Sequence, residues 1–344
     1  MPSLLRVSSL RVSSLRVAPL LALTLLGSAP VCEARPTPLL SAAGPLRPAP
    51  SPAEPLIADA PLWGAKDAAR SQPFLRVTLH GQPATLLLRL DSDVPLQLAT
   101  VALTQLGTPI ARETRELDSL TIGTTVERQL PVTFNEDPSW AVLPPPGYPP
   151  VVGVLGGAFL RRYDVLYDLP GARVRLYRPV KPAAPGQGKA PAPWLPPGMK
   201  PSDCGRLVPL PPRTGAYTAF ALQLEGHPVT GVVELAPTYE KLNQAAVQAL
   251  GFPDSSARIE PIPAGLLSPG YRHNGFLITQ QVRDVHLRLG PTPFWSGPVQ
   301  IFPSLDIESV LGAKTPVILL NLNTLRHVVL FNAPSRAQVC VSSP

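Results

Sequence analysis

The residues best placed to do chemistry stand at the end of one largely apolar run, where residues 84–90 lead directly into Asp91, Ser92 and Asp93. A run of this length and composition predicts a strand that is buried on both of its faces. A carboxylate at the end of such a strand can serve as a general acid or base. The plainer interpretation is that Asp91 caps the turn after the strand, as Asp often does.

Other kinds of chemistry find little support in the sequence. The five histidines and three cysteines show no metal-ligand spacing and no Cys-x-x-Cys pair. No Gly-x-Ser-x-Gly motif provides a serine nucleophile, and the segment 186–189 lacks the Ser or Thr that a phosphate-binding loop needs after its Lys. The four tryptophans are interpreted as packing anchors rather than as a sugar-binding platform. We therefore expect no metal and no organic cofactor.

Prolines and glycines dominate the composition, with 47 Pro and 25 Gly among 344 residues. So many prolines exclude a helix bundle, and a hydrophobic content of 44% excludes a chain that is disordered throughout. The net charge of +7 comes from scattered Arg and Lys residues without a basic run, so no nucleic-acid partner is expected. The composition favours a strand-rich protein with proline-rich connectors.

Residues 1–34 have the pattern of an export signal. Three arginines precede an uncharged stretch at 17–31, and Ala34 provides a small residue for cleavage. This stretch is shorter than the roughly 20 residues of a membrane-spanning helix, so no stable membrane span is expected. We expect export to the periplasm or the extracellular space. A lipoprotein anchored through Cys32 is the less favoured alternative, because residues 29–31 lack the pattern that precedes a lipidated Cys.

The prolines concentrate in two stretches that divide the chain. Eight lie within residues 35–62 and eight within residues 179–201. We interpret residues 35–70 as an extended, disordered stalk and residues 181–203 as a linker between two domains.

The segments on either side of the second linker repeat one another. Each copy has a strand after a Gly-x-Pro turn, then a strand that ends in Gly, then Pro-Val eight residues later, and finally a longer matching segment. Because these matches occur in the same order, they predict two related lobes, at 71–180 and 204–344. The paired segments are 81–91 with 226–236, 117–123 with 285–290, Pro131-Val132 with Pro298-Val299, and 154–170 with 319–334.

The first lobe resembles the aspartic proteases of the pepsin and retropepsin clan. The resemblance rests on Leu90-Asp91-Ser92, on the Ser-Leu-x-Ile-Gly strand at 119–123, and on the glycine-rich segment 153–160. It implies an all-β fold with two pepsin- or retropepsin-like barrel lobes from an internal duplication and few short helices, as in exported bacterial members. It also implies an aspartic-type endopeptidase, in which Asp91 is one half of a water-activating pair and Ser92 supports the loop. Two such carboxylates share one proton, because both cannot ionise at close range.

The sequence departs from the family pattern at two positions. Asp93 stands where the family has Gly, and Ala236 stands where the second lobe should provide its Asp. In an active enzyme, the second carboxylate would have to come from Asp93, from Glu234, or from Asp91 of another subunit. The alternative is a catalytically inactive pseudoprotease that binds a peptide or acts as a scaffold. The expected partner is accordingly a polypeptide substrate or a peptide ligand, and the oligomeric state stays open.

Two further features of the second lobe bear on function. An insert that contains Gly270 and Tyr271 is a candidate for a mobile flap over a substrate, or for an ordinary surface loop. Removal of the signal peptide would leave Cys204 and Cys340, and two cysteines in an oxidising compartment favour a disulfide. The alternative is a pair of buried free thiols.

Overall fold

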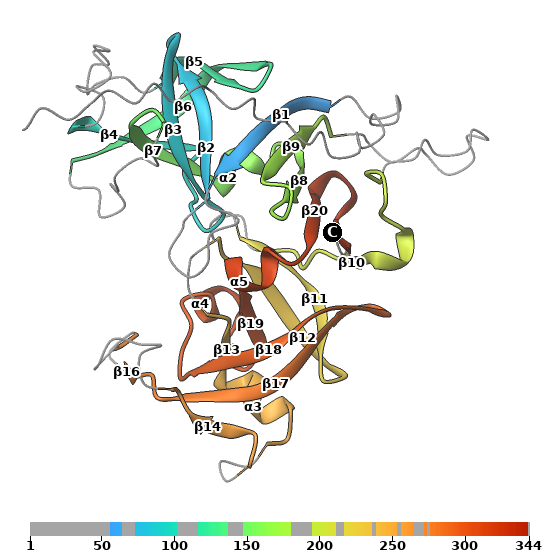
Figure 1. Cartoon of the computed structure of the whole chain (residues 1–344). Coiled ribbons are helices and arrows are strands. Elements are labelled where there is room, and N and C mark those ends of the chain that lie inside the picture. The colour runs from blue at the N-terminus through green and yellow to red at the C-terminus, as the bar shows by residue number, and fades with distance from the viewer. Residues whose placement is uncertain are drawn as a thin grey trace, which may run out of the picture. The chain divides into compact units, whose positions relative to one another are not determined.

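The computed structural model describes residues 56–63, 73–101, 116–136, 147–179, 195–210, 217–235, 239–252, 256–263, 272–273 and 276–342. These residues form an all-β fold of two lobes, each a closed six-stranded barrel, with few short helices (Figure 1). The segment 1–34, predicted to be an export signal, lies outside the described residues. Within the described ranges, no helix has the length and apolar character needed to cross a membrane.

The first barrel has six strands and closes on itself. Hydrogen bonding follows the order β2-β3-β7-β4-β6-β5, and β5 pairs back with β2. The middle of β3 is buried over five consecutive residues, as expected for the strand that leads to Asp91. The strands are β2 (Phe74–Leu79), β3 (Gln82–Arg89), β4 (Leu96–Ala99), β5 (Glu116–Ile122), β6 (Thr125–Asn135) and β7 (Val151–Gly156).

The second barrel has the same design. Its order is β11-β12-β19-β13-β18-β17, and β17 pairs back with β11. β14 (Ile259–Pro261) adds an outer strand to β17, while β15 (Arg272–His273) and β16 (Phe276–Leu277) form a separate hairpin. The six barrel strands are β11 (Thr218–Leu224), β12 (His227–Val233), β13 (Lys241–Asn243), β17 (Gln280–Leu289), β18 (Thr292–Phe302) and β19 (Val317–Leu320).

The strand registers make the two barrels comparable residue by residue. In each barrel, the second strand runs parallel to the strand that precedes a short helix, α2 (Gly157–Leu160) or α5 (Leu322–Leu325). Leu88 lies opposite Leu155, and Val233 lies opposite Leu320; both Leu155 and Leu320 stand directly before the helix N-cap. Counting onward from these pairs, Arg89 corresponds to Glu234 and Asp91 corresponds to Ala236.

Both barrels begin with the same tight turn. His80 and Gly81 have φ values of 46° and 79°, and Glu225 and Gly226 have values of 52° and 83°. Two consecutive residues with positive φ characterise a type I′ hairpin turn, whose twist matches that of the flanking strands. Because side chains other than Gly rarely adopt positive φ, the recurrence at His80 and Glu225 supports the equivalence of the two hairpins.

A ladder of six strands joins the lobes, with three strands from each half of the chain. β8 pairs antiparallel with β20, so the two central strands come from different lobes. Asp164 on β8 also accepts hydrogen bonds from the Ser335 amide at 3.1 Å and the Ser335 hydroxyl at 2.5 Å. The order is β1 (Leu56–Trp63), β9 (Arg173–Tyr177), β8 (Asp164–Asp168), β20 (Val329–Ala333), β21 (Gln338–Ser342) and β10 (Cys204–Arg206).

β1 lies inside the segment that the sequence predicts to be a stalk. Ala58, Ala60 and Leu62 alternate along the strand and are buried, and β1 pairs with both β9 and β2. The stalk prediction is therefore wrong for residues 56–63. The sequence does show the alternation of apolar residues that is typical of a strand. The high local proline content nevertheless favours a disordered stalk as the interpretation of this segment.

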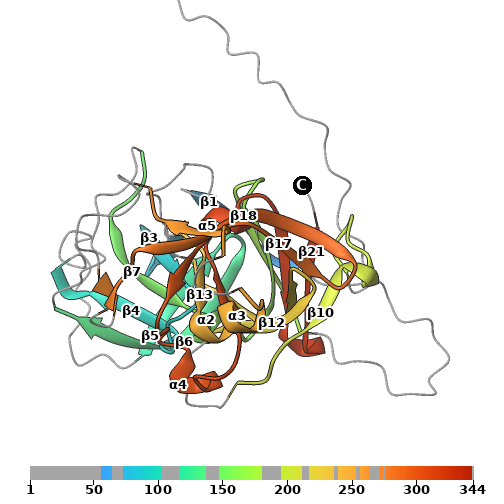
Figure 2. The same ribbon diagram turned by 90° about the horizontal axis from the view of Figure 1, so that it is seen from below.

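β10 occupies the place in the second half of the ladder that β1 occupies in the first. Cys204 lies opposite Cys340 on β21, and a disulfide joins them across a sequence separation of 136 residues. Figure 2 shows the tip of the β17–β18 hairpin beside β10, where Thr292 Oγ1 donates to Asp203 Oδ1 at 3.0 Å. The remaining helices are α3 (Gln244–Ala249), α4 (Glu308–Leu311), η1 (Pro201–Asp203) and η2 (Pro334–Arg336).

Candidate functional site between the lobes

Asp91 follows the end of β3, but its carboxylate is already engaged. Arg89 Nε donates to Asp91 Oδ1 at 3.0 Å, and Arg89 Nη2 donates to Asp91 Oδ2. The Asp91 side chain is 18% exposed. A guanidinium that binds both oxygens of one carboxylate forms the strongest and most directional type of ion pair. Asp91 therefore forms a bidentate ion pair with Arg89, which lies at the end of β3.

The loop after Asp91 packs tightly on the glycine that precedes α2. The Gly156 amide donates to Pro95 O at 3.0 Å, and the Ala158 amide donates to Ser92 O at 3.2 Å. A side chain at Gly156 would place its Cβ 1.9 Å from Val94 O, so only glycine allows this approach. Ser92 thus supports the loop through its backbone carbonyl, while its hydroxyl lies 3.4 Å from Val94 O. The Asp93 side chain is exposed on the same loop.

The second lobe places a charge of opposite sign at the position equivalent to Arg89. Glu234 follows β12, and its Oε2 accepts a hydrogen bond from Lys241 Nζ at 3.1 Å. Lys241 is nearly buried, with 9% of its side chain exposed. The predicted position of the missing second Asp, Ala236, lies outside the described residues. The end of each equivalent strand is thus occupied by an ion pair, Arg89 with Asp91 and Glu234 with Lys241.

Asn321 is the residue that sequence reasoning missed. It corresponds to Gly156, because each residue is the N-cap of the short helix after the equivalent strand. Asn321 is fully buried, and its Nδ2 donates to Tyr239 O. A buried amide side chain thus stands in the second lobe at the position where the first lobe has a glycine. The signal was available, since the matched segments 154–170 and 319–334 already place a Gly opposite an Asn.

The charges at the two strand ends act on one another. The hydrogen bonds that Arg89 donates to Asp91 raise the pKa of Arg89, and the nearby Glu234 charge raises it further. Burial raises the pKa of Tyr217 to about 12, with additional contributions from Asp91 and Glu234. Groups from both lobes therefore share one electrostatic environment, and this environment combines cationic, anionic and phenolic side chains.

Glu240, another carboxylate near the end of β12 in the sequence, has a different task. It is fully buried, and its Oε1 accepts hydrogen bonds from the Thr324 amide at 2.8 Å and the Thr324 hydroxyl at 2.6 Å. Its Oε2 accepts a hydrogen bond from Asn323 Nδ2 at 3.3 Å. Burial raises the pKa of Glu240, despite the opposing effect of these donors. Glu240 thus binds the first turn of α5.

The remaining predictions concern the flap and metal binding. Gly270 and Tyr271, the candidate flap residues, lie outside the described residues, although the β15–β16 hairpin follows them directly. In the described part of the chain, no group of three His, Cys, Asp or Glu side chains could hold a metal ion.

The similarities of this chain to known proteins are found among solved structures. No family model matches the chain, and no curated protein sequence is similar to it. Among solved structures, a retropepsin-like aspartic protease from Rickettsia conorii matches with 14% sequence identity and a TM-score of 0.22. The match covers 32% of this chain and 87% of that chain. The description of two barrels rests on the strand pairings given above.

Proposed function

We propose that this protein is a catalytically inactive member of the aspartic-protease fold that binds polypeptide between its two lobes. One observation carries the proposal: both carboxylate oxygens of Asp91 accept hydrogen bonds from Arg89. A catalytic carboxylate of this class must hold a water and share a proton with a second carboxylate. The oxygens of Asp91 are instead committed to a guanidinium.

The second lobe supports the same conclusion from another direction. At the strand end that should provide the partner carboxylate, the chain has Glu234 in an ion pair with Lys241. Asn321 stands at the position of Gly156, and its side chain donates to Tyr239 O instead of leaving room for a closely packed loop. What stays in place is a partly exposed polar site with charges of both signs, which suits the amides and charged side chains of a bound peptide better than it suits hydrolysis.

The proposal includes export and an origin by internal duplication. Equivalent strand registers and equivalent positive-φ turns support the duplication. The basic and apolar N-terminal segment supports export, and so does the Cys204–Cys340 disulfide, because such bonds persist in oxidising compartments. Asp91 is assigned to the binding site rather than to a water-activating pair.

The test is a proteolysis assay combined with a binding assay on the purified protein. Unfolded casein is incubated with the protein from pH 3 to pH 7, with and without a pepstatin-type inhibitor, and we expect no cleavage. In parallel, affinity for an unfolded polypeptide is measured, and we expect Arg89→Gln to weaken it at least severalfold. Cleavage that both the inhibitor and Asp91→Asn abolish would contradict the proposal and restore the protease assignment. Unchanged affinity in Arg89→Gln would show that the polypeptide does not bind between the lobes.

A further inference from the structure

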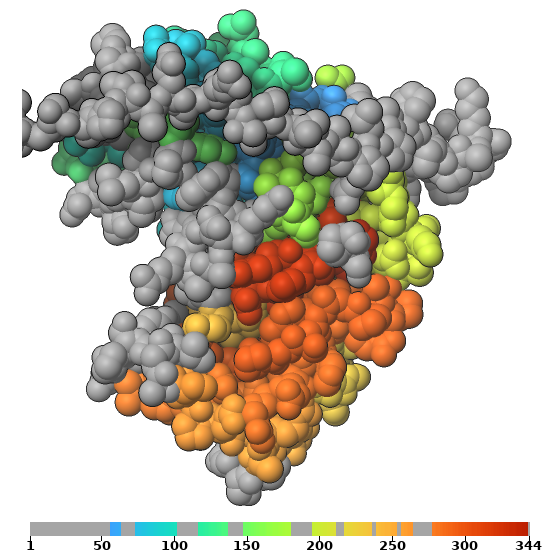
Figure 3. Space-filling view, in the orientation of Figure 1, coloured from blue at the N-terminus to red at the C-terminus, as the bar shows by residue number. Residues whose placement is uncertain are grey.

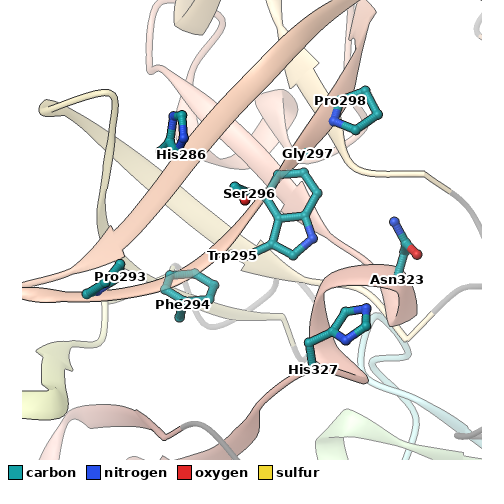
Figure 4. Close-up of a pocket in the computed structure, with 9 residues that line it drawn as sticks. All are labelled: His286, Pro293, Phe294, Trp295, Ser296, Gly297, Pro298, Asn323 and His327. Carbon is teal, nitrogen blue, oxygen red and sulfur yellow. The ribbon is translucent and has the colours of Figure 1, made fainter.

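The second lobe contains a pocket beside its β17–β18 hairpin. It has a volume of about 570 Å³ and lies between the β17–β18 hairpin and α5 (Figure 4). This volume falls within the range of about 300–1,000 Å³ that is typical of small-molecule sites. In Figure 3, the orange surface of the hairpin adjoins the red surface of the α5–β20 region on the face in view. The lining residues are His286, Pro293, Phe294, Trp295, Ser296, Gly297, Pro298, Asn323 and His327.

The equivalent place in the first lobe is filled. Glu127 corresponds to Trp295, because each lies opposite an equivalent leucine, Leu120 or Leu287, of the partner strand. Arg162 likewise corresponds to His327, since each stands two residues after the end of its helix. In the first lobe, Arg162 Nη2 donates to Glu127 Oε2 at 2.9 Å.

Further contacts consolidate this closed arrangement in the first lobe. The Tyr163 hydroxyl also donates to Glu127. The Arg162 guanidinium lies 5.6 Å from the centre of the Phe159 ring and 5.7 Å from that of Tyr163. An ion pair and two aromatic rings therefore bridge hairpin and helix in one lobe, where the other lobe has an open pocket.

The Trp295 indole presents a flat aromatic face to the pocket and packs closely on Gly297. A Cβ added at Gly297 would lie 2.7 Å from Trp295 Cζ2, so the indole folds back over a residue that must be glycine for this packing. In Figure 4, the indole nitrogen is turned toward Asn323 and His327. Among the described residues, the Trp295 indole N–H, the His327 imidazole and the Ser296 hydroxyl have no hydrogen-bond partner. These groups are available to a ligand.

The lining consists of aromatic, imidazole, amide, hydroxyl and apolar groups. It contains no Asp, Glu, Lys or Arg. Two carboxylates contact lining residues: Glu225 contacts His286 at 2.9 Å, and Glu240 contacts Asn323 at 3.3 Å. Each of these carboxylates helps to fix the orientation of a lining side chain. The backbone of β17 is paired with β18, so an extended peptide cannot add as a strand between them. Recognition must therefore come from side chains.

We propose that this pocket binds a neutral saccharide. A sugar ring presents an apolar face that can stack on the Trp295 indole, and its rim of hydroxyl groups matches the amide, imidazole, hydroxyl and indole N–H groups that surround the pocket. An anionic ligand would find no Lys or Arg, and a cationic ligand would find no carboxylate in the lining. The site lies on one lobe and is independent of the peptide-binding site proposed between the lobes.

Calorimetric titration of the purified protein with maltotriose, cellotriose, chitotriose and mannotriose tests the proposal. We expect one of these sugars to bind. Trp295→Ala should raise its dissociation constant by about thirtyfold, which is the size of effect seen when an aromatic anchor of a binding site is truncated. Gly297→Ala should also weaken it, because the added methyl group displaces the indole. Unfolding curves of the variants establish that they are folded.

Two substitutions use the first lobe as the reference. The double variant Trp295→Glu with His327→Arg places the equivalents of Glu127 and Arg162 in the second lobe. The resulting ion pair should close the pocket and abolish sugar binding. Arg162→His makes the matched exchange in the first lobe and should leave the affinity unchanged. The proposal fails if none of the four sugars binds at millimolar concentration, or if Trp295→Ala binds as well as the wild type. It also fails if a decaproline peptide occupies the pocket, with Trp295→Ala sensitivity, while the sugars do not.

Discussion

The two lobes share a scaffold and differ in what fills it. Strand order, pairing direction and the positive-φ turns agree between them, while the residues at the strand ends and behind the hairpins do not. In the first lobe, Gly156 admits a tightly packed loop, and an ion pair bridges hairpin and helix. In the second, Asn321 stands at the position of Gly156, and an open pocket lies between hairpin and helix. The two lobes thus agree in strand register and differ in the side chains at these two places.

The largest expected effect concerns the outer strands of the shared ladder. β1 pairs with β9 over five residues, but β10 pairs with β21 over only three and relies on the Cys204–Cys340 bond. We expect the double substitution of Cys204 and Cys340 by Ser to lower the free energy of unfolding by about 4 kcal/mol. Urea unfolding with and without reductant measures it. A loss below about 1 kcal/mol would mean that β10 holds without its disulfide.

The next largest effect exchanges the N-cap residues of the two lobes. Gly156→Asn should destabilise the protein by about 3 kcal/mol, because its Cβ would meet Val94 O at 1.9 Å. Asn321→Gly, the reverse exchange, loses a hydrogen bond to Tyr239 O and should cost about 1 kcal/mol. Denaturant titration of both variants measures the difference. Equal costs would show that the loop can relax away from Gly156.

A third exchange concerns the carboxylate that binds α5. Glu240 corresponds to Leu96 in the first lobe, since Lys241 and Gln97 hold the same register position. Glu240→Leu should cost about 2 kcal/mol, because the buried Thr324 amide and hydroxyl would lose their acceptor. Thermal unfolding would reveal it as a lower midpoint. An unchanged midpoint would indicate that α5 finds another acceptor.

The same carboxylate makes stability depend on pH. Its folded-state pKa is raised above the ordinary value of 4.5, so the folded protein binds the proton more tightly than the unfolded chain does. The contribution of this group is therefore present at acid pH and is lost as the pH rises above 4.5. Unfolding free energies measured from pH 4 to pH 8 should fall less steeply in Glu240→Gln than in the wild type. A steeper fall in the variant would reverse this sign.

The smallest effect concerns the carboxylate–histidine pair beside each first turn. His80 contacts Asp118 at 3.7 Å in the first lobe, while Glu225 contacts both His286 and Arg258 in the second. Partly exposed pairs of this kind contribute up to about 1 kcal/mol. Chemical denaturation should show a larger loss for Glu225→Gln than for Asp118→Asn, because Glu225 has two partners. The opposite ranking would show that the number of partners does not set the contribution.

Much of the scaffold could be predicted from the sequence, because the repeated segments carry the information that sets strand register. The repeated segments contain the equivalent strands β3 and β12, and Pro131 and Pro298 hold equivalent positions on β6 and β18. β1 was missed, since its alternating apolar residues stand in a proline-rich segment whose composition suggested a stalk.

The contents of the site were harder to predict than the scaffold. Arg89 belongs to a run that looks apolar as a whole, and nothing in the local sequence shows that its side chain turns back to Asp91. Trp295 was interpreted as a packing anchor. It does pack against the core, but it also lines a pocket that depends on His327, which is distant in sequence. Such pairings arise only from the tertiary fold, and local patterns do not record them.

The antiparallel pairing of β8 with β20 relates the lobes as two subunits of a symmetric dimer would be related, but within one chain. In a true homodimer, every residue meets surroundings made by an identical copy, so a basic residue at the strand end would face a second basic residue. Covalent linkage removes that restriction. Arg89 and Glu234, which occupy equivalent positions, carry opposite charges and attract one another. A single polypeptide can thus hold complementary rather than identical halves, a form of asymmetry that genes for identical subunits cannot encode.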